Sequence, residues 1–439
     1  MKKVVKFGGS SLADAIQFEK VKEIITADPS RRYVVPSAPG KRNPSDTKVT
    51  DLLLKCYDML TAGRPYLKVL EQIRVRYAEI IRGLGLKVSL VKEFDRIRKE
   101  LESGAGLDYV VSRGEYLNGK IMADYLGYDF IDAANVIRFD DDGELDAEET
   151  YRLMKIQLDA HERAVIPGFY GSKKNGKVVA FSRGGSDITG SLVARAIKAD
   201  LYENWTDVSG FMVADPRIVQ NPQVIHTITY TELRELAYMG ASVMHEDAIF
   251  PVSQAGIPIN ILNTNKPEDE GTMIVEHTSR IPKYTITGIA GMRGFVAMSI
   301  EKDKMNNAVG FCRKALTAFE ESGVSVEHMP SGIDTMSVIV RQDDFSEKEQ
   351  QIISRIEELC EPDKIDLESD LSLIAVVGRG MKSTRGTAGR LFSALAHAHI
   401  NVKMIDQGSS ELNIIIGVSS ADFEDAVRAI YKIFVDTAL

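Results

Sequence analysis

The chain opens with a short apolar run that ends in two glycines, and this feature constrains the fold more than any other. Residues 6–11 have the sequence KFGGSS and follow two valines. The pattern predicts a buried strand that turns through the glycines into a helix, with Ser11 as N-cap and Asp14 completing a capping box. Glycines let backbone N–H groups approach an anion at a helix N-terminus, and Lys6 would add a positive charge beside it. The start therefore predicts a phosphate site, although a Gly-Gly pair can also form a plain tight turn.

Composition excludes several classes of partner. The net charge is −9, with 63 acidic against 54 basic residues, whereas nucleic acids and anionic membranes bind basic faces. Cys56, Cys312 and Cys360 are scattered without disulfide or metal-ligand spacing, as a reducing cytosol permits. No apolar run approaches the roughly 18 residues of a membrane span. We therefore expect a cytoplasmic protein of about two to four domains that binds neither nucleic acid nor membrane.

Strand and helix patterns alternate through the first two-thirds of the chain. Short strands are expected near residues 33–35, 165–169, 201–205 and 259–262, and residues 50–105 predict a helical insertion. This alternation predicts an α/β fold with a mostly parallel sheet and helices on both faces, a three-layer αβα sandwich. Ligands bind such sheets where loops leave the carboxyl ends of the strands.

Beyond residue 284 the pattern changes to two strand–helix–strand–strand–helix–strand units of about seventy residues each. The two units are weakly similar, since GVSV at 323–326 corresponds to HINV at 399–402. We therefore predict two ferredoxin-like βαββαβ (α+β) modules. The acidic segment 363–370 between them is expected to be an exposed connection. The predicted domains are residues 1–283, 284–362 and 363–439.

A second glycine pair repeats the design of the first. Residues 181–187, FSRGGSD, place Arg183 and Asp187 around the glycines, and a planar guanidinium suits a carboxylate. Residues 204–210, NWTDVSG, follow another strand. Each segment alone can be ordinary loop chemistry. Together they bring four charged side chains to the ends of strands in one sheet, namely Lys6, Arg183, Asp187 and Asp207.

Taken in chain order, these motifs resemble the amino acid kinase superfamily and, within it, monofunctional aspartokinases of the lysine-sensitive type. The resemblance extends over nearly the whole length. The two C-terminal modules resemble tandem ACT domains, and QGSSELN at 407–413 is typical of them. Further matching motifs are TDLL at 50–53, VSRGE at 111–115, GF at 168–169, ADPR at 214–217, GASVMH at 240–245 and GT at 271–272.

The resemblance implies transfer of the ATP γ-phosphoryl group to the β-carboxylate of L-aspartate, the first step of lysine, threonine and methionine biosynthesis. A carboxylate nucleophile with a pKa near ~3.9 is already ionised and needs no strong general base. The site must instead supply positive charge and alignment. Mg²⁺, held mainly by ATP rather than by a metal site of the protein, would bridge the phosphates.

The resemblance also implies roles for individual residues. Lys6 would stabilise the transferring phosphoryl group, and Asp187 would hold Lys6 in place. Arg183 would bind the substrate α-carboxylate and Glu115 its amino group. The expected phosphate-binding residues are Gly8, Gly9, Ser10 and Ser37. The expected substrate-binding residues are Thr50, Glu115, Phe169, Arg183 and Ser186. The expected ATP-binding residues are Thr206, Asp207, Met212, Asp215 and Arg217.

Feedback inhibition by lysine at the first ACT module is implied as well. A helix N-terminus in this module would bind the effector carboxylate, and Glu327 or Asp334 would meet its distant ammonium group. The two acids can also be ordinary surface charges. ACT modules commonly pair across subunits, so a homodimer is expected. The expected effector-binding residues are Met305, Val326, Glu327, Ser331 and Asp334.

Three positions depart from the family pattern. Ser242 stands where several relatives have a lysine that reaches the nucleotide, Glu246 replaces a common proline, and Arg113 replaces a frequent histidine. A sister kinase acting on glutamate, acetylglutamate or a nucleoside monophosphate would share the glycine loops. A non-catalytic amino-acid sensor would share the ACT modules. A fused dehydrogenase is disfavoured, because Ser383 stands where the third glycine of a dinucleotide fingerprint belongs.

Overall fold

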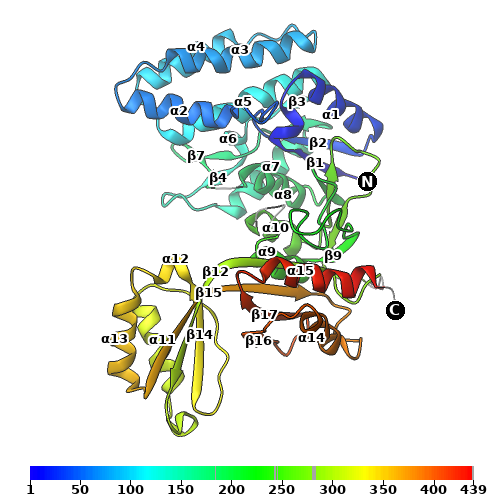
Figure 1. The fold of residues 1–439 in the computed structure, drawn as a ribbon. Coiled ribbons are helices and arrows are strands. Elements are labelled where there is room, and N and C mark those ends of the chain that lie inside the picture. The colour runs from blue at the N-terminus through cyan, green and yellow to red at the C-terminus, as the bar shows by residue number, and fades with distance from the viewer. Residues whose placement is uncertain (183, 242–243, 245, 279–282, 438–439) are drawn as a thin grey trace. The chain divides into compact units, whose positions relative to one another are not determined.

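A computed structural model describes residues 1–182, 184–241, 244, 246–278 and 283–437. Contacts divide the chain into two compact units (Figure 1). The first unit comprises Met1–Phe211, Val224–Tyr230 and Val243–Thr278, and the second comprises Met212–Gln223, Thr231–Ser242 and Ser279–Leu439. The chain therefore enters the second unit twice before residue 279, and the domain limits at residues 283 and 362 stay predictions.

The first unit is built on an eight-stranded sheet in the order β3-β5-β2-β1-β8-β10-β11-β9. Neighbouring strands are parallel except for β10 and β11. The α/β class and the mostly parallel sheet are therefore confirmed. The strands are β1 (Lys3–Phe7), β2 (Arg31–Pro36), β3 (Asp129–Phe130), β5 (Ala164–Val165), β8 (Leu201–Thr206), β9 (Thr227–Thr229), β10 (Ile259–Asn263) and β11 (Thr272–Val275).

Strands β1 and β8 lie in the middle of this sheet and are buried on both faces. Val4, Val5 and Phe7 are fully buried, and Phe7 stacks on Trp205 with ring centroids 5.9 Å apart. Helix α8 (Gly185–Ala196) packs against β1, β2 and β8. A strand that is buried on both faces needs a continuous apolar run, which explains the residues that precede the first glycine pair.

Helices α2, α3 and α4 gather with α5 at one end of the first unit (Figure 1). Residues 50–105, for which a helical insertion is predicted, are therefore mostly helical. On α3 the apolar side chains of Ile73, Tyr77 and Ile80 are buried at helical spacing. The four helices are α2 (Val49–Thr61), α3 (Leu67–Gly83), α4 (Val91–Glu102) and α5 (Leu107–Leu126).

The predicted start of the first helix is wrong in one respect. Gly9–Leu12 form a 3₁₀ turn, η1, and helix α1 (Ala15–Ala27) begins only after it. The N-cap is Asp14, whose side chain accepts the Gln17 N–H at 3.0 Å. The hydroxyl of Ser11 is instead buried 2.7 Å from Thr264 Oγ1. The extra tight turn therefore moves the cap from the serine to the aspartate.

The remaining elements of the first unit are a small sheet and further helices. A small sheet contains β4 (Arg138–Phe139), β6 (Tyr170–Lys173) and β7 (Val178–Ala180). The other helices are α6 (Ala133–Val136), α7 (Ala147–Asp159) and α10 (Glu246–Gln254). Helix α9 (Tyr230–Tyr238) continues from the first unit into the second, to which its residues from 231 onward belong.

The second unit contains a six-stranded antiparallel sheet in the order β13-β14-β12-β15-β17-β16. Strands β12 (Gly288–Glu301) and β15 (Lys364–Val377) pair with each other almost from end to end. The second half of β12 also pairs with β14 (Thr335–Arg341), and the second half of β15 pairs with β17 (Asn413–Ser419). The duplicated α+β modules are confirmed, and they share these two long strands.

Helices complete each of the two modules. In the first, α11 and α13 enclose a buried cluster with the sheet that includes Met298, Phe319 and Ile352. The remaining elements are η2 (Met305–Asn307), α11 (Phe311–Glu321), β13 (Val326–His328), α12 (Gln342–Phe345), α13 (Glu349–Cys360), α14 (Thr387–His397), β16 (Met404–Asp406), α15 (Phe423–Tyr431) and η3 (Lys432–Asp436). Among the described residues, no helix is long and apolar enough to cross a membrane.

The prediction that residues 363–370 form an exposed connection is wrong. From Lys364 onward these residues belong to β15, and Ile365 is paired with Ile300 of β12. Most side chains in this half of the strand are exposed, so the sequence lacks the apolar alternation that marks a strand. The neighbouring strand satisfies the backbone hydrogen bonds in spite of the acidic side chains.

Candidate active site

Lys6 occupies the penultimate position of β1, and only 8% of it is exposed. Its Nζ lies 2.6 Å from Asp187 Oδ1 and 3.3 Å from Asn204 Oδ1. The Asn204 side chain donates from Nδ2 to the same Asp187 oxygen at 2.9 Å. Lys6 and Asn204 are direct partners in the pairing of β1 with β8. An ammonium, a carboxylate and an amide thus form a closed triangle at the carboxyl edge of the sheet.

The glycine loop after β1 uses its backbone N–H groups unequally. Gly8 donates its N–H to Trp205 O at 3.0 Å, which prolongs the pairing of β1 with β8. This group is therefore not free for a phosphate, although Gly8 was expected to donate. The N–H groups of Gly9 and Ser10 precede the first bond of the 3₁₀ turn, from Ser11 N to Gly8 O at 3.1 Å. They are the donors that this turn leaves for an anion.

The loop after β2 packs directly on the glycine loop. Gly40 donates its N–H to Gly9 O at 2.7 Å, and a Cβ on Gly40 would lie 2.5 Å from the Gly9 carbonyl carbon. Ser37, an expected phosphate-binding residue, donates its N–H to Phe7 O at 3.0 Å. The backbone approach admits only glycine at position 40, and it brings the phosphate-binding candidates into one cluster.

Arg76 of α3 connects the helical insertion to both loops. Its Nη2 donates to Ala13 O at 2.9 Å and to Gly40 O at 2.6 Å. Its Nη1 lies 2.6 Å from Asp46 Oδ2. The residue is only 4% exposed, so this guanidinium replaces water as the partner of two loop carbonyls. Sequence reasoning missed Arg76, because its partners are 30 to 63 positions away along the chain.

Glu115 of α5 lies behind the loop after β2 and is 5% exposed. Its Oε1 accepts the Ala38 N–H at 3.1 Å, while its Oε2 has no hydrogen-bond partner among the described residues. Burial raises the pKa of Glu115 to about 8. A buried carboxyl with one unpartnered oxygen is suited to receive the ammonium group of a ligand. Thr50, half-buried at the start of α2, follows the same loop.

The Gly168–Phe169 segment packs against the start of α8. A Cβ on Gly168 would lie 2.6 Å from Ser186 Oγ, so the glycine permits this close contact. Phe169 has a φ of 82°, a conformation that is costly for a non-glycine residue and concentrates at functional sites. Its N–H is donated to Thr189 Oγ1 at 3.1 Å. Phe169 and Ser186 are thus adjacent, whereas Arg183 lies outside the described residues.

The expected ATP-binding residues fall in both units. Thr206 ends β8, and its hydroxyl donates to Asp207 Oδ1 at 3.1 Å. Met212, Asp215 and Arg217 belong to the second unit. There Arg217 Nη2 lies 2.6 Å from Asp215 Oδ2, and hydrogen bonds from Arg217 lower the pKa of that carboxyl. The pair is on the surface, with the Arg217 side chain 87% exposed.

Of the three departures from the family pattern, only Arg113 has a described side chain. Arg113 is 5% exposed, and its guanidinium lies over the rings of Tyr109, Tyr116 and Tyr170 at 4.6, 4.4 and 5.2 Å. Cation–π contacts therefore stabilise the positive charge of Arg113, which stands where histidine is frequent in the family. Ser242 and the side chain of Glu246 lie outside the described residues.

The segments expected to bind an effector are joined to each other. Asp334 accepts the Lys304 N–H through Oδ1 at 2.8 Å, and Asn306 donates its N–H to Ile333 O at 3.1 Å. Met305 is buried in the module core, and Val326 is half-buried on β13. Ser331 and Asp334 are exposed.

Glu327 is already paired inside the protein. Its side chain is 6% exposed, and its Oε1 accepts from Arg341 Nε at 3.0 Å. Its Oε2 accepts the hydroxyl of Tyr238 on α9. The same helix contacts the second module, because Glu232 pairs with Arg379 at 2.8 Å and Glu235 accepts from Asn413 at 2.5 Å. Helix α9 is thus bonded to both modules.

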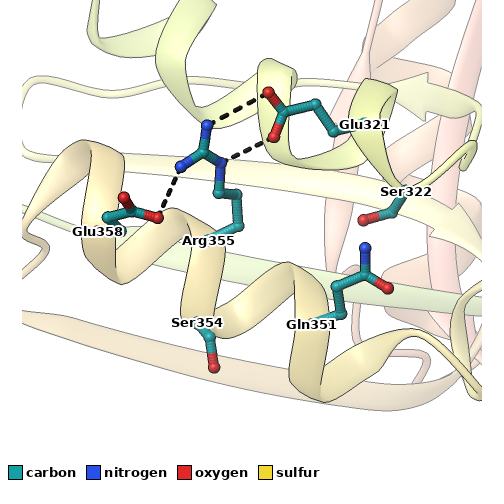
Figure 2. Close-up of a pocket in the computed structure, with 6 residues that line it drawn as sticks. All are labelled: Glu321, Ser322, Gln351, Ser354, Arg355 and Glu358. Atoms are coloured by element: carbon teal, nitrogen blue, oxygen red, sulfur yellow. Dashed lines mark hydrogen bonds and ion pairs between the residues drawn. The ribbon is translucent and has the colours of Figure 1, made fainter.

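A shallow pocket lies between α11 and α13 of the first module (Figure 2). Arg355 points into it and bonds Glu321 Oε2 at 2.7 Å and Glu358 Oε2 at 2.6 Å. The guanidinium is thus shared by two exposed carboxylates, and the pocket contains none of the predicted site residues. Among the described residues, no group of three or more His, Cys, Asp or Glu side chains is arranged to hold a metal ion.

Comparison with known proteins identifies the family. Residues 1–263 match the amino acid kinase family, and residues 374–434 match an ACT domain. Aspartokinase 3 of Bacillus subtilis is 41% identical over 447 residues, covering 98% of each chain. The chain belongs to the aspartokinases of the amino acid kinase family. The family assignment that the motifs suggested is therefore confirmed.

Two further relatives bear on the fold and its regulation. The crystal structure of Clostridium acetobutylicum aspartate kinase, described as an allosteric enzyme, is 51% identical and has a TM-score of 0.89. The match covers 99% of this chain and 100% of that one. The lysine-sensitive aspartokinase 3 of Escherichia coli is 26% identical, with 98% of each chain covered.

Proposed function

We propose that the chain transfers the γ-phosphoryl group of ATP to the β-carboxylate of L-aspartate and so forms 4-phospho-L-aspartate. The supporting observation is the buried Lys6–Asp187 pair beside the N–H groups of Gly9 and Ser10. One carboxylate oxygen of aspartate attacks the γ-phosphorus, and the P–O bond to ADP breaks with its electron pair. Lys6 stabilises the negative charge of the transferring group. No proton has to leave the nucleophile, and Asp187 accordingly holds Lys6 rather than acting as a base.

The substrate is proposed to lie between the loop after β2 and the start of α8. Glu115 would receive the ammonium group of aspartate on its unpartnered Oε2, and Arg183 would bind the α-carboxylate. Thr50, Phe169 and Ser186 would shape the pocket. This spacing of charges favours aspartate over glutamate, which is one methylene longer.

We also propose contacts for the nucleotide. Ser37 would join Gly9 and Ser10 at the phosphates. Mg²⁺ would arrive with ATP and neutralise phosphate charge. The remaining proposed ATP-binding residues are Thr206, Asp207, Met212, Asp215 and Arg217.

Lysine is proposed as the effector, as the name of the Escherichia coli relative suggests. It would bind near Met305, Val326, Ser331 and Asp334 of the first module. Its side-chain ammonium would compete with Arg341 and Tyr238 for Glu327. Occupation of the site would thus change a contact made by α9. We further propose a homodimer formed through the ACT modules and a cytoplasmic location.

A hydroxylamine trapping assay tests the reaction, because hydroxylamine converts acyl phosphates into hydroxamates. Purified chain with ATP and Mg²⁺ should yield aspartyl hydroxamate, and glutamate should react poorly. The Lys6→Met variant should lose about 10²–10³ in kcat while keeping its circular dichroism spectrum. A wild-type protein that forms no aspartyl phosphate, or that phosphorylates glutamate equally well, would refute the proposal. Lysine binding without any turnover would instead identify an amino-acid sensor.

A further inference from the structure

Asn204 is the third member of the triangle with Lys6 and Asp187. It is 3% exposed and lies on the central strand β8, directly opposite Lys6 in the parallel register. Its Oδ1 accepts from Lys6 Nζ at 3.3 Å, and its Nδ2 donates to Asp187 Oδ1 at 2.9 Å. The amide therefore bonds both members of the proposed catalytic ion pair at once.

An amide fits this pair of contacts with the given charges. An ammonium has donors alone and an ionised carboxylate has acceptors alone, so the bridging group must offer one acceptor and one donor. Asn204 offers both, and its orientation follows from those partners. Because its backbone is fixed between β1 and β10, the side chain has little freedom to leave the pair.

A second contact from the same strand supports this arrangement. Tyr202, two residues earlier and on the same side of β8, donates its hydroxyl to Asp187 O at 3.1 Å. A Cβ on Gly190 would lie 2.4 Å from that hydroxyl, so α8 approaches the strand closely. Strand β8 thus positions both the backbone and the carboxylate of Asp187.

We propose that Asn204 is a positioning residue for phosphoryl transfer, which fixes the ammonium of Lys6 and the carboxylate of Asp187 relative to each other. This inference rests on the proposed function, in which Lys6 contacts the transferring group. In this role Asn204 would contact Lys6 and Asp187 but neither substrate. Its loss should therefore reduce kcat far more than it changes either KM, because the alignment of Lys6 matters most in the transition state.

Two substitutions separate this role from a merely structural one. Asn204→Leu removes both contacts and should lower kcat about 10- to 100-fold, with both KM values within about twofold of wild type. Asn204→Asp keeps the size but puts a carboxylate oxygen where Nδ2 lies, 2.9 Å from Asp187 Oδ1. Two carboxylates this close share a proton at low pH, and the protonated oxygen can donate as Nδ2 does. The kcat of this variant, relative to wild type, should therefore be highest near pH 6 and fall towards pH 9.

Asn260→Leu is the matched control. Asn260 lies on the adjacent strand β10, and within the described part of the chain its side chain donates only to Glu270 O, at 3.4 Å. The kcat of Asn260→Leu and the pH dependence of this kcat should equal those of wild type. Thermal melts should show that every variant is folded. A constant ratio of Asn204→Asp to wild-type kcat across this pH range would overturn the inference, as would unchanged kcat in Asn204→Leu. If wild type forms no aspartyl phosphate, the proposed function itself fails.

Discussion

Replacing Glu115 by glutamine should stabilise the protein and weaken its affinity for aspartate at the same time. The carboxyl is buried, accepts one backbone N–H and leaves Oε2 unpartnered. Glutamine keeps the size and the acceptor for Ala38 N–H but cannot ionise. A buried group that is needed for a ligand rather than for the fold should show this opposition between stability and binding.

The sign and size of the effect follow from the pKa. Burial raises the pKa of Glu115 from 4.5 to about 8, so between these values the folded protein keeps a proton that the unfolded chain releases. The stability that depends on Glu115 being neutral is thus fully present below pH 4.5. It decreases as the pH rises above 4.5 and is lost as the pH rises through 8. Each pH unit above 4.5 costs about 1.36 kcal/mol, so the free energy of unfolding is lowered by about 1 kcal/mol at pH 5 and by about 3 kcal/mol at pH 7.

Thermal melts at several pH values measure this directly. The Tm of Glu115→Gln should exceed that of wild type by an amount that grows by roughly 5 °C between pH 5 and pH 7. The side-chain amide introduced by Glu115→Gln can shift Tm by an amount that does not depend on pH, and such a shift leaves the increase between pH 5 and pH 7 unchanged. Because aspartate should bind the ionised form, its KM in wild type should fall about fivefold from pH 7 to pH 8. In the variant this KM should be high and independent of pH.

A Tm difference that stays constant with pH would show that Glu115 is ionised in the folded protein, which contradicts the reasoning. If the stabilisation of Glu115→Gln depends on pH but its KM for aspartate equals that of wild type, the raised pKa of Glu115 is supported. The proposed contact between Glu115 and the ammonium group of aspartate is then refuted.

Three further substitutions test the loops and the regulatory contacts. Gly40→Ala places a Cβ 2.5 Å from the Gly9 carbonyl carbon, so the KM for ATP should rise and Tm should fall; steady-state kinetics that match wild type would contradict this. Arg76→Leu leaves two buried loop carbonyls without a donor and should cost about 2–5 kcal/mol in urea unfolding. The exposed Arg74→Leu should leave the midpoint of urea unfolding close to that of wild type. Tyr238→Phe removes one bond to Glu327 for which lysine would compete, so it should tighten lysine binding by calorimetry and leave uninhibited turnover unchanged. Because the contact with α9 is then already absent, lysine inhibition should weaken, and unaltered inhibition would exclude this contact from the regulatory path.

Local sequence determined the parts of this protein whose geometry depends on neighbouring residues. The apolar run before the first glycine pair predicts a central strand because such a strand is buried on both faces. Helical periodicity predicts the insertion in the first unit, and the repeated order of elements predicts the two modules. The first glycine pair could be placed at the edge of the sheet because parallel strands end together. The prediction that the second pair follows a strand of the same sheet is wrong, because β7 belongs to the small sheet and pairs antiparallel with β6.

Tertiary structure decided everything that depends on register or on partners distant in sequence. Asn204 bonds Lys6 only because β8 pairs with β1 across 198 residues, and no local pattern records that register. The same pairing takes the Gly8 N–H away from the phosphate site. The acidic first half of β15 is a strand because β12 satisfies its backbone, although its side chains carry no strand pattern. Backbone hydrogen bonds between distant segments leave almost no trace in side-chain composition, and for that reason only the folded chain shows them.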